Sequence, residues 1–165
     1  MAAPDAAGRL GPLTDLVVQR LKVSDQVAAA KFGTDKPIDD PVREQQELAE
    51  VRAQATALGI DPDHTAAFFQ DQITASKLVQ RGLFDRWTKH PDQAPTTRPD
   101  LNEIRVELDQ LTTSLLQQLV ATDGIRHPGI TCRVQVTEAQ LSAVVIDRLD
   151  GLHREALRTA LRSVC

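Results

Sequence analysis

The sequence predicts an all-α fold, a single-domain bundle of about five to six helices that spans residues 1–165. Apolar residues make up 41% of the chain but aromatic residues only 3%, with no Tyr, so the core must consist of Leu, Val, Ile and Ala. This composition favours helix over sheet. Apolar residues also recur at helical spacing in long segments that Pro and Gly separate. A chain of this length buries roughly two-thirds of the surface of its unfolded form, which makes one domain sufficient.

The first two helices follow from their apolar spacing and their end signals. The first begins after Gly11-Pro12 and continues toward Lys31, and its repeating apolar positions are Leu13, Leu16, Val17 and Leu21. The second spans residues 41–58, because Asp40-Pro41 supplies an N-cap followed by proline and Gly59 ends the segment.

A third helix over residues 62–88 begins with the same signal, Asp61-Pro62, and a Pro- and Thr-rich loop follows it over residues 90–99. Asp100, with Glu103 three residues later, caps a fourth helix. The buried face of this fourth helix is formed by Leu101, Ile104, Leu108, Leu111, Leu115 and Leu119.

The last third of the chain is less regular. Residues 123–136 are interrupted by glycine and proline, and the alternation in residues 131–136 indicates a short strand. Thr137 and Gln140 form a capping box for one last helix. Its inward positions are expected at Leu141, Val144, Val145, Leu149, Leu152, Ala156 and Leu161.

Charge and hydropathy exclude two classes of partner. The formal net charge is −4, from 19 basic and 23 acidic residues, and no basic block stands alone, so we expect no nucleic-acid partner. No run approaches the eighteen or so apolar residues of a membrane span, and the first twelve residues lack the pattern of a signal peptide, so we expect no membrane partner.

Four cations border the predicted core. Arg20 lies beside the apolar face of the first helix, and Lys31, eleven residues later, is close to three whole turns away on the same face. Arg43 lies in the first turn of the second helix with Glu47 on the same side, and Arg105 lies at the margin of the fourth helix's buried face.

Two polar residues of the third helix, Ser76 and Gln80, continue the apolar line of Phe69 and Ile73. A single arginine beside an apolar face usually extends to water. Four cations directed toward one interior are costly without anions, whereas a ligand with more than one negative charge would satisfy them. The residues alone therefore predict a helical protein with an anion pocket.

Other kinds of chemistry have no support in the sequence. The four histidines lack metal-ligand spacing, so no metal site is expected. The sequence contains no glycine-rich phosphate loop, nucleophile elbow or dinucleotide fingerprint. The two cysteines, Cys132 and Cys165, are equally compatible with a disulfide and with two free thiols.

Four stretches carry a family resemblance: RLKVSDQVAAAK at residues 20–31, PIDD at 37–40, FQDQITAS at 69–76 and FDRW at 84–87. Their order and spacing, together with the late cysteine pair, resemble the secreted (periplasmic or exported, gamma) subclass of all-helical, type II chorismate mutases. The resemblance implies an enzyme that rearranges chorismate to prephenate, in aromatic amino acid biosynthesis, without a cofactor. It further implies an active site within one subunit, a homodimer, and a secreted or periplasmic location.

The resemblance also assigns roles to residues. It implies that the substrate is bound by Arg20, Lys31, Arg43, Glu47, Ser76, Gln80 and Arg105. Of these, Lys31, Gln80, Arg43 and Arg105 are expected to be catalytic. Glu47 stands where secreted members usually have Gln, and Gln80 where they usually have Glu. The resemblance also implies that Cys132 and Cys165 form a disulfide.

The sequence is also compatible with two alternatives. The first is a secreted helical protein that has lost catalysis and binds another dicarboxylate or a protein partner, which Glu47 favours. The second is a structural bundle that dimerises through apolar surface, and it predicts no stabilisation by a ligand.

Overall fold

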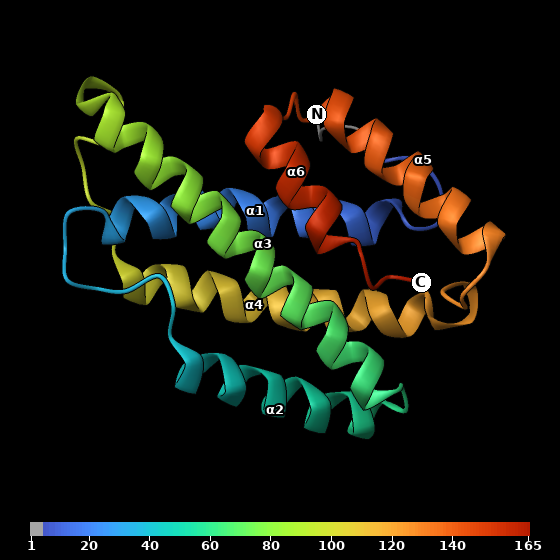
Figure 1. Cartoon of the computed structure of the whole chain (residues 1–165). Helices are drawn as coiled ribbons and strands as arrows, with labels where there is room; N and C mark the ends of the chain where they lie inside the picture. Colours follow the sequence, from blue (N-terminus) through green and yellow to red (C-terminus); the bar gives the residue numbers. More distant parts are fainter. Residues whose placement is uncertain (1–4) are drawn as a thin grey trace.

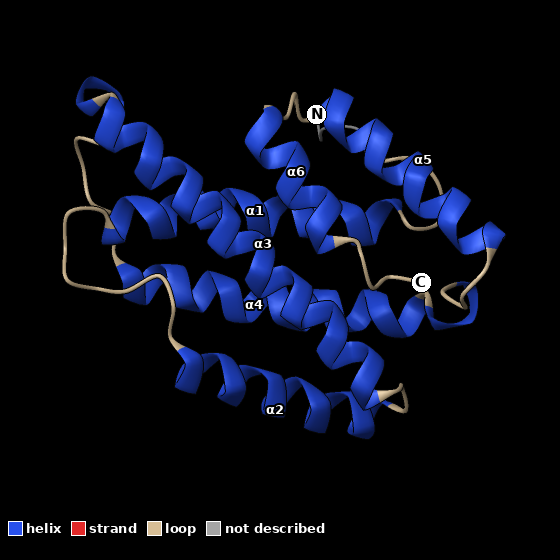
Figure 2. Ribbon diagram, in the orientation of Figure 1, coloured by secondary structure: helices blue, strands red, loops and turns tan. Residues whose placement is uncertain are grey.

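The computed structural model describes residues 5–165, which form six α-helices and two short 3-10 helices, with no strand among them (Figure 2). The elements in chain order are α1 (Gly11–Lys31), α2 (Pro41–Leu58), α3 (Pro62–Lys89), η1 (Pro91–Gln93), α4 (Leu101–Ala121), η2 (Asp123–Ile125), α5 (Ile130–Ile146) and α6 (Gly151–Ala160). Within the described residues, no helix is long and apolar enough to cross a membrane.

The longest helix, α3, organises the bundle. It packs against α1, α2 and α6, and α1 packs against α4 on its other side. Figure 1 shows α3 crossing in front of α1 and α4, with α2 along one edge of the molecule and α5 and α6 at the opposite edge. Gly82 permits close packing of α3 on α6, because a Cβ at this position would lie 2.5 Å from a methyl group of Leu152.

The main core is mostly aliphatic, as the composition predicts, but Phe68, Phe69 and Trp87 are buried in it as well. Its fully buried residues include Leu13, Val17, Leu115, Leu119 and Leu157.

The predicted starts of the first four helices agree with the structure. Asp40 accepts a hydrogen bond from the backbone N–H of Arg43, and Asp61 accepts two from the first turn of α3. Asp100 accepts one from the N–H of Asn102 at the start of α4. These aspartates satisfy backbone donors that a helix leaves free at its first turn. The third helix ends at Lys89, one residue beyond the prediction.

The strand predicted over residues 131–136 is wrong, because this segment is the first part of α5. Over six residues, an alternating pattern and one face of a helix are difficult to distinguish. The buried positions of α5 are Cys132, Ala139 and Ala143, which recur at helical spacing. Thr137 is not a cap, since its hydroxyl donates to the carbonyl of Arg133 within the same helix.

The prediction of a single last helix is also wrong, because the helical structure is interrupted between Ile146 and Gly151, which separates α5 from α6. Arg148 has a positive φ of 50° at the break, and Asp150 caps α6 by accepting from the N–H of His153. Two residues expected to face inward, Leu141 and Val145, are 62% and 76% exposed. Further along, the expected inward positions Ala156 and Leu161 are buried.

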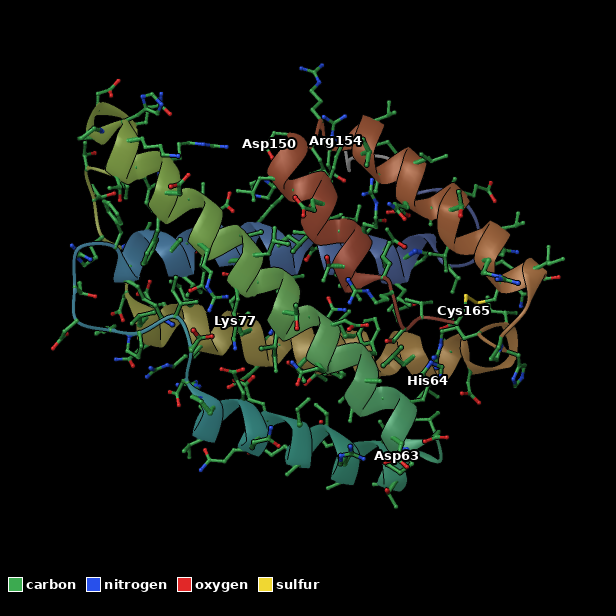
Figure 3. All side chains as sticks on the ribbon, viewed as in Figure 1. Asp63, His64, Lys77, Asp150, Arg154 and Cys165 are labelled. Carbon is green, nitrogen blue, oxygen red and sulfur yellow. A yellow bond between two sulfur atoms is a disulfide. The ribbon has the colours of Figure 1, made fainter. Side chains whose placement is uncertain are left out.

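A disulfide joins Cys132 near the start of α5 to Cys165 at the last position, with 5.9 Å between the two Cα atoms. Figure 3 shows Cys165 and its sulfur beside α5. The bond closes a loop that contains all of α6, since the cysteines are 33 residues apart.

Candidate active site

A cavity of about 290 Å³ lies where α1, α2, α3 and α4 meet the segment that connects α1 to α2. Its size suits a small molecule. The residues around it are Arg20, Val27, Lys31, Lys36, Pro37, Ile38, Asp40, Arg43, Glu44, Glu47, Ile73, Ser76, Lys77, Gln80, Leu101, Ile104, Arg105 and Leu108.

All seven residues predicted to bind a ligand line this one cavity. Helix α1 contributes Arg20 and Lys31, and α4 contributes Arg105. The pairs on the remaining two helices are Arg43 with Glu47 on α2 and Ser76 with Gln80 on α3. The described part of the chain thus assembles the whole set within one subunit.

Arg20 is the most deeply placed of the cations. Its Nη1 donates to the backbone carbonyl of Gln72 at 3.1 Å, but its buried Nε has no hydrogen-bond partner. Burial lowers the pKa of Arg20, and the negative charge of Glu47 opposes this effect. A buried guanidinium N–H without an acceptor is costly, so an anionic ligand in the cavity would stabilise this arrangement.

Lys31 ends α1 at the wall of the cavity, and its Nζ donates to the carbonyl of Pro37 at 3.0 Å. The pKa of Lys31 is lowered by burial and by the positive charges of Arg43 and Arg105, against a smaller opposing effect of Asp40 and Glu44. The site therefore holds cations close enough to disfavour one another, which is the electrostatic signature of an anion site.

Arg43 and Arg105 approach the cavity from α2 and α4. Arg43 Nε lies 3.5 Å from Glu47 Oε1, in a pair whose side chains are both more than 40% exposed. Arg105 forms no salt bridge with any described residue. Both guanidinium groups can therefore bind a carboxylate in the two-pronged geometry that arginine favours.

Ser76 and Gln80 form a polar row on α3. Gln80 Nε2 donates to Ser76 Oγ at 3.0 Å, and the Ser24 hydroxyl of α1 lies 2.8 Å from the same oxygen. Gln80 is 4% exposed, and its buried Oε1 has no partner. The amide oxygen and nitrogen exchange places when the amide group rotates by half a turn, and the Ser76 hydroxyl would then donate to Oε1. The rotated amide presents a free N–H at the position that now lacks a partner.

Four charged residues of the cavity are not among those that the sequence predicts for the site: Lys36, Asp40, Glu44 and Lys77. The sequence predicts Asp40 only as a helix cap. Lys77 directly follows Ser76, and its place on the same stretch of α3 as the predicted polar row is the signal in the sequence that could identify it. Lys36 precedes α2, and its position depends on the path of the loop. Together with the four predicted cations and Glu47, these residues give the cavity six cations against three carboxylates.

This arrangement can bind and orient a small molecule that carries several negative charges. Apolar side chains of Val27, Ile73 and Ile104 complete the wall, so the ligand must also present an apolar body. The cations can stabilise negative charge that develops on a reacting oxygen. Chemistry that needs only positioning and electrostatic stabilisation fits these groups.

Comparison with known proteins points to the same chemistry. Residues 12–81 match the family described as chorismate mutase type II. The chain is 38% identical to the secreted chorismate mutase of Mycolicibacterium smegmatis, over 99% of this chain and 90% of that protein. It is 34% identical to the secreted chorismate mutase of Mycobacterium tuberculosis, over 100% and 82% of the two chains. The crystal structure of chorismate mutase from Burkholderia thailandensis superposes with a TM-score of 0.89 at 37% identity, over 95% of this chain and 99% of that chain.

Proposed function

This chain belongs to the type II chorismate mutases, and from that premise we propose that residues 1–165 act as one catalytic domain with the α1–α4 cavity as its active site. The chain is a chorismate mutase, an isomerase whose substrate is the dianion chorismate and whose product is prephenate. The observation that carries the assignment of the site is the convergence of Arg20, Lys31, Arg43 and Arg105 on one cavity.

The reaction is an intramolecular rearrangement, in which one C–O bond breaks while one C–C bond forms. It needs no protein nucleophile and no proton transfer. The protein must hold the substrate in its reactive conformer and stabilise the charge that develops on the ether oxygen. We assign these two tasks to different groups of residues.

The three arginines bind the two substrate carboxylates. Arg20 supports this role through its buried, unpartnered Nε, and Arg105 through its freedom from salt bridges among the described residues. Arg43 is oriented by Glu47, 3.5 Å away, which gives the acid at this position a structural role beside its partner. Ser76 hydrogen-bonds the carboxylate on the ring.

Lys31 and Gln80 donate to the ether oxygen. Lys31 brings a full positive charge, and Gln80 brings an amide N–H after the half-turn described above. A charge-assisted hydrogen bond to a developing oxyanion contributes roughly 3 to 4 kcal/mol, whereas a millionfold acceleration requires roughly 8 kcal/mol. These two donors therefore supply a large share of the acceleration.

Incubation of the purified protein with chorismate tests the function. Loss of chorismate absorbance with formation of prephenate, faster than in buffer, is expected. A folded protein that chorismate stabilises against heat without prephenate appearing would instead be the inactive binding protein. If chorismate neither stabilises the protein against heat nor is consumed by it, the protein is a purely structural bundle.

We also propose export and a homodimer. The relatives are named secreted, and the Cys132–Cys165 disulfide suits an oxidising compartment. Helix α5 buries small residues and exposes four large apolar ones, which are 59–76% exposed: Ile130, Val134, Leu141 and Val145. Their spacing of four, seven and four residues reads the same in both directions, so two antiparallel α5 helices would pair Ile130 with Val145 and Val134 with Leu141 about a two-fold axis.

Light scattering during size-exclusion chromatography tests the dimer. The wild-type protein is expected at twice its chain mass of 18.1 kDa, and Leu141→Lys at the mass of one chain. Val106→Lys on α4 is the matched control, since Val106 is also more than half exposed but lies outside α5. A monomeric wild-type protein would contradict the proposal.

A further inference from the structure

Lys77, a cavity residue without an assigned role, binds two carboxylates at once. Its Nζ lies 2.9 Å from Asp39 Oδ1 and 2.6 Å from Glu44 Oε1, and its side chain is 20% exposed. Burial alone would lower the pKa of Lys77, but the hydrogen bonds that its ammonium donates to Glu44 and Asp39 outweigh this effect, and the pKa is raised. Figure 3 shows Lys77 on α3, near the segment that leads into α2. The ammonium is thus held charged between α3 and the start of α2.

From Lys77, polar contacts continue into the turn that carries Arg43. The second oxygen of Glu44, Oε2, accepts from the backbone N–H of Asp40 at 2.9 Å. Asp40 Oδ1 in turn accepts from the backbone N–H of Arg43 at 3.2 Å. Asp39 is bound a second time, by the guanidinium of Arg81, also on α3. Lys77 and Arg81 of α3 therefore bind the first turn of α2 and Asp39, the residue before its N-cap.

Apolar packing does little to hold this region. The buried residues of α2 are Val51 and Ala55, both in its second half, and Leu48 before them is partly buried against the main core. Arg43 lies more than one turn before Leu48, in the first turn of the helix. In the connecting segment, residues 33–37 are exposed and Ile38 is only partly buried. The α2 side of the cavity therefore depends on polar contacts to α3 for its position.

We propose that Lys77 is a positioning residue, which anchors the start of α2 through Glu44 and Asp39 and so keeps Arg43 placed for the substrate. This inference rests on the proposed function, because it concerns the geometry of the same site. A loosened turn would leave only a fraction of molecules competent to bind, which raises the apparent dissociation constant by the inverse of that fraction. At saturating substrate, binding restores the placement of Arg43 in all molecules, so the loosened turn affects KM more than kcat.

The competing role for Lys77 is direct contact with a substrate carboxylate, since it lines the cavity. The two roles give opposite results when Glu44 is changed. If Lys77 acts through Glu44, removing either charge breaks the same anchor. If Lys77 binds the substrate directly, removing Glu44 frees the ammonium and improves binding.

Steady-state kinetics of Lys77→Gln, Glu44→Gln and the double variant decide between the roles. As an anchor, Lys77→Gln raises KM about tenfold with kcat within about threefold, Glu44→Gln does the same, and the double variant is no worse than either. Lys77→Arg, which keeps the charge, restores most of the loss. Lys89→Gln is the control, because Lys89 lies on the same helix in an exposed pair with Asp85. A lower KM in Glu44→Gln, or additive losses in the double variant, would overturn the anchor.

Amide hydrogen exchange of the ligand-free protein provides a test that does not require chorismate turnover. The hydrogen-bonded backbone N–H groups of Asp40, Arg43 and Glu44 are expected to exchange at least about tenfold faster in Lys77→Gln than in wild type, with α6 unchanged. Equal exchange in the two proteins would overturn the proposal even if the enzyme is active. A wild-type protein without mutase activity would overturn the proposed function, while the exchange result would still decide whether Lys77 holds the turn.

Discussion

Lys31 Nζ donates to the carbonyl oxygen of Pro37 across 3.0 Å, and this bond holds the last side chain of α1 against the wall of the cavity. The carbonyl provides a neutral acceptor for an ammonium whose pKa is lowered by burial and by its cationic neighbours Arg43 and Arg105. A dianionic substrate reverses that electrostatic effect. The pH dependence of the reaction should therefore differ between the free and the occupied site.

The first prediction concerns the alkaline side of the pH profile. Lys31 carries its positive charge, and so donates a charge-assisted hydrogen bond, only when protonated. Therefore kcat/KM should fall as pH rises through a pKa below the ordinary lysine value. The bound dianion raises that pKa, so kcat should fall at a higher pH than kcat/KM. Both are measured from initial rates across a pH series. Lys31→Arg is the control, since an arginine stays charged and should abolish the alkaline fall in whatever activity remains. Coincident falls in kcat and kcat/KM would contradict the prediction.

A second prediction separates the amide of Gln80 from an acid. An amide donates without titrating, so wild-type activity should persist into mildly alkaline pH. In Gln80→Glu the buried acid must be protonated to donate, and kcat should fall steeply above about pH 5 to 6. The comparison uses kcat profiles of both proteins from acidic to mildly alkaline pH. A wild-type profile that itself falls near pH 5 to 6 would refute the role of Gln80.

The disulfide gives a prediction about stability. The Cys132–Cys165 bond closes a loop across α6, so the double variant Cys132→Ser, Cys165→Ser should lose roughly 3 to 4 kcal/mol of unfolding free energy in urea. The cavity lies on α1 to α4, so the kcat of the folded variant should stay within about twofold of wild type. Unchanged stability, or a loss of activity without unfolding, would count against this account of the bond.

The contacts of His153 lead to a second prediction, that the free energy of unfolding depends on pH. Its Nε2 and Nδ1 lie 2.7 Å from Asp25 of α1 and 2.7 Å from Asp150, the cap of α6, and Arg86 of α3 lies 3.6 Å from Asp150. The hydrogen bond to Asp25, with a further one to Asp150, raises the pKa of His153 to about 9 against the effect of burial.

Because the folded-state pKa of His153 is raised, its contribution to stability is fully present below about pH 6.5 and is lost as pH rises through about 9. Urea unfolding at pH 6 and at pH 10 should show His153→Gln losing about 2 kcal/mol relative to wild type at the lower pH and much less at the higher. A difference that does not depend on pH would show that His153 acts only by packing.

Much of the fold could be predicted from local signals. Asp40-Pro41, Asp61-Pro62 and Asp100 mark helix starts because an aspartate satisfies backbone donors of the first turn in any surrounding structure. The region after residue 123 could not be predicted in this way. There the buried face of α5 is made of small residues and its large apolar residues face outward, so hydrophobic spacing indicates the wrong face. The positive φ at Arg148 has no marker in the sequence either.

In the site, too, the residues that local signals place could be predicted, and the contacts that depend on the packing of helices could not. Arg20, Lys31 and Arg105 could be placed because each has a fixed rotation relative to the apolar face of its own helix. The anchor between Lys77 and Glu44 could not, because it depends on where the α1–α2 segment brings α2 against α3. Such a contact between helices is a property of the packing.

The most direct test of the account is kcat for Lys31→Ala beside Ser76→Ala, measured by chorismate consumption with both proteins shown to be folded. Lys31 is assigned to the charge that develops in the transition state, so its removal should lower kcat about 10²- to 10³-fold. Ser76, assigned to a carboxylate that is charged throughout, should cost less than about tenfold. Equal, mild losses in the two variants would contradict the assignment of Lys31 to the ether oxygen.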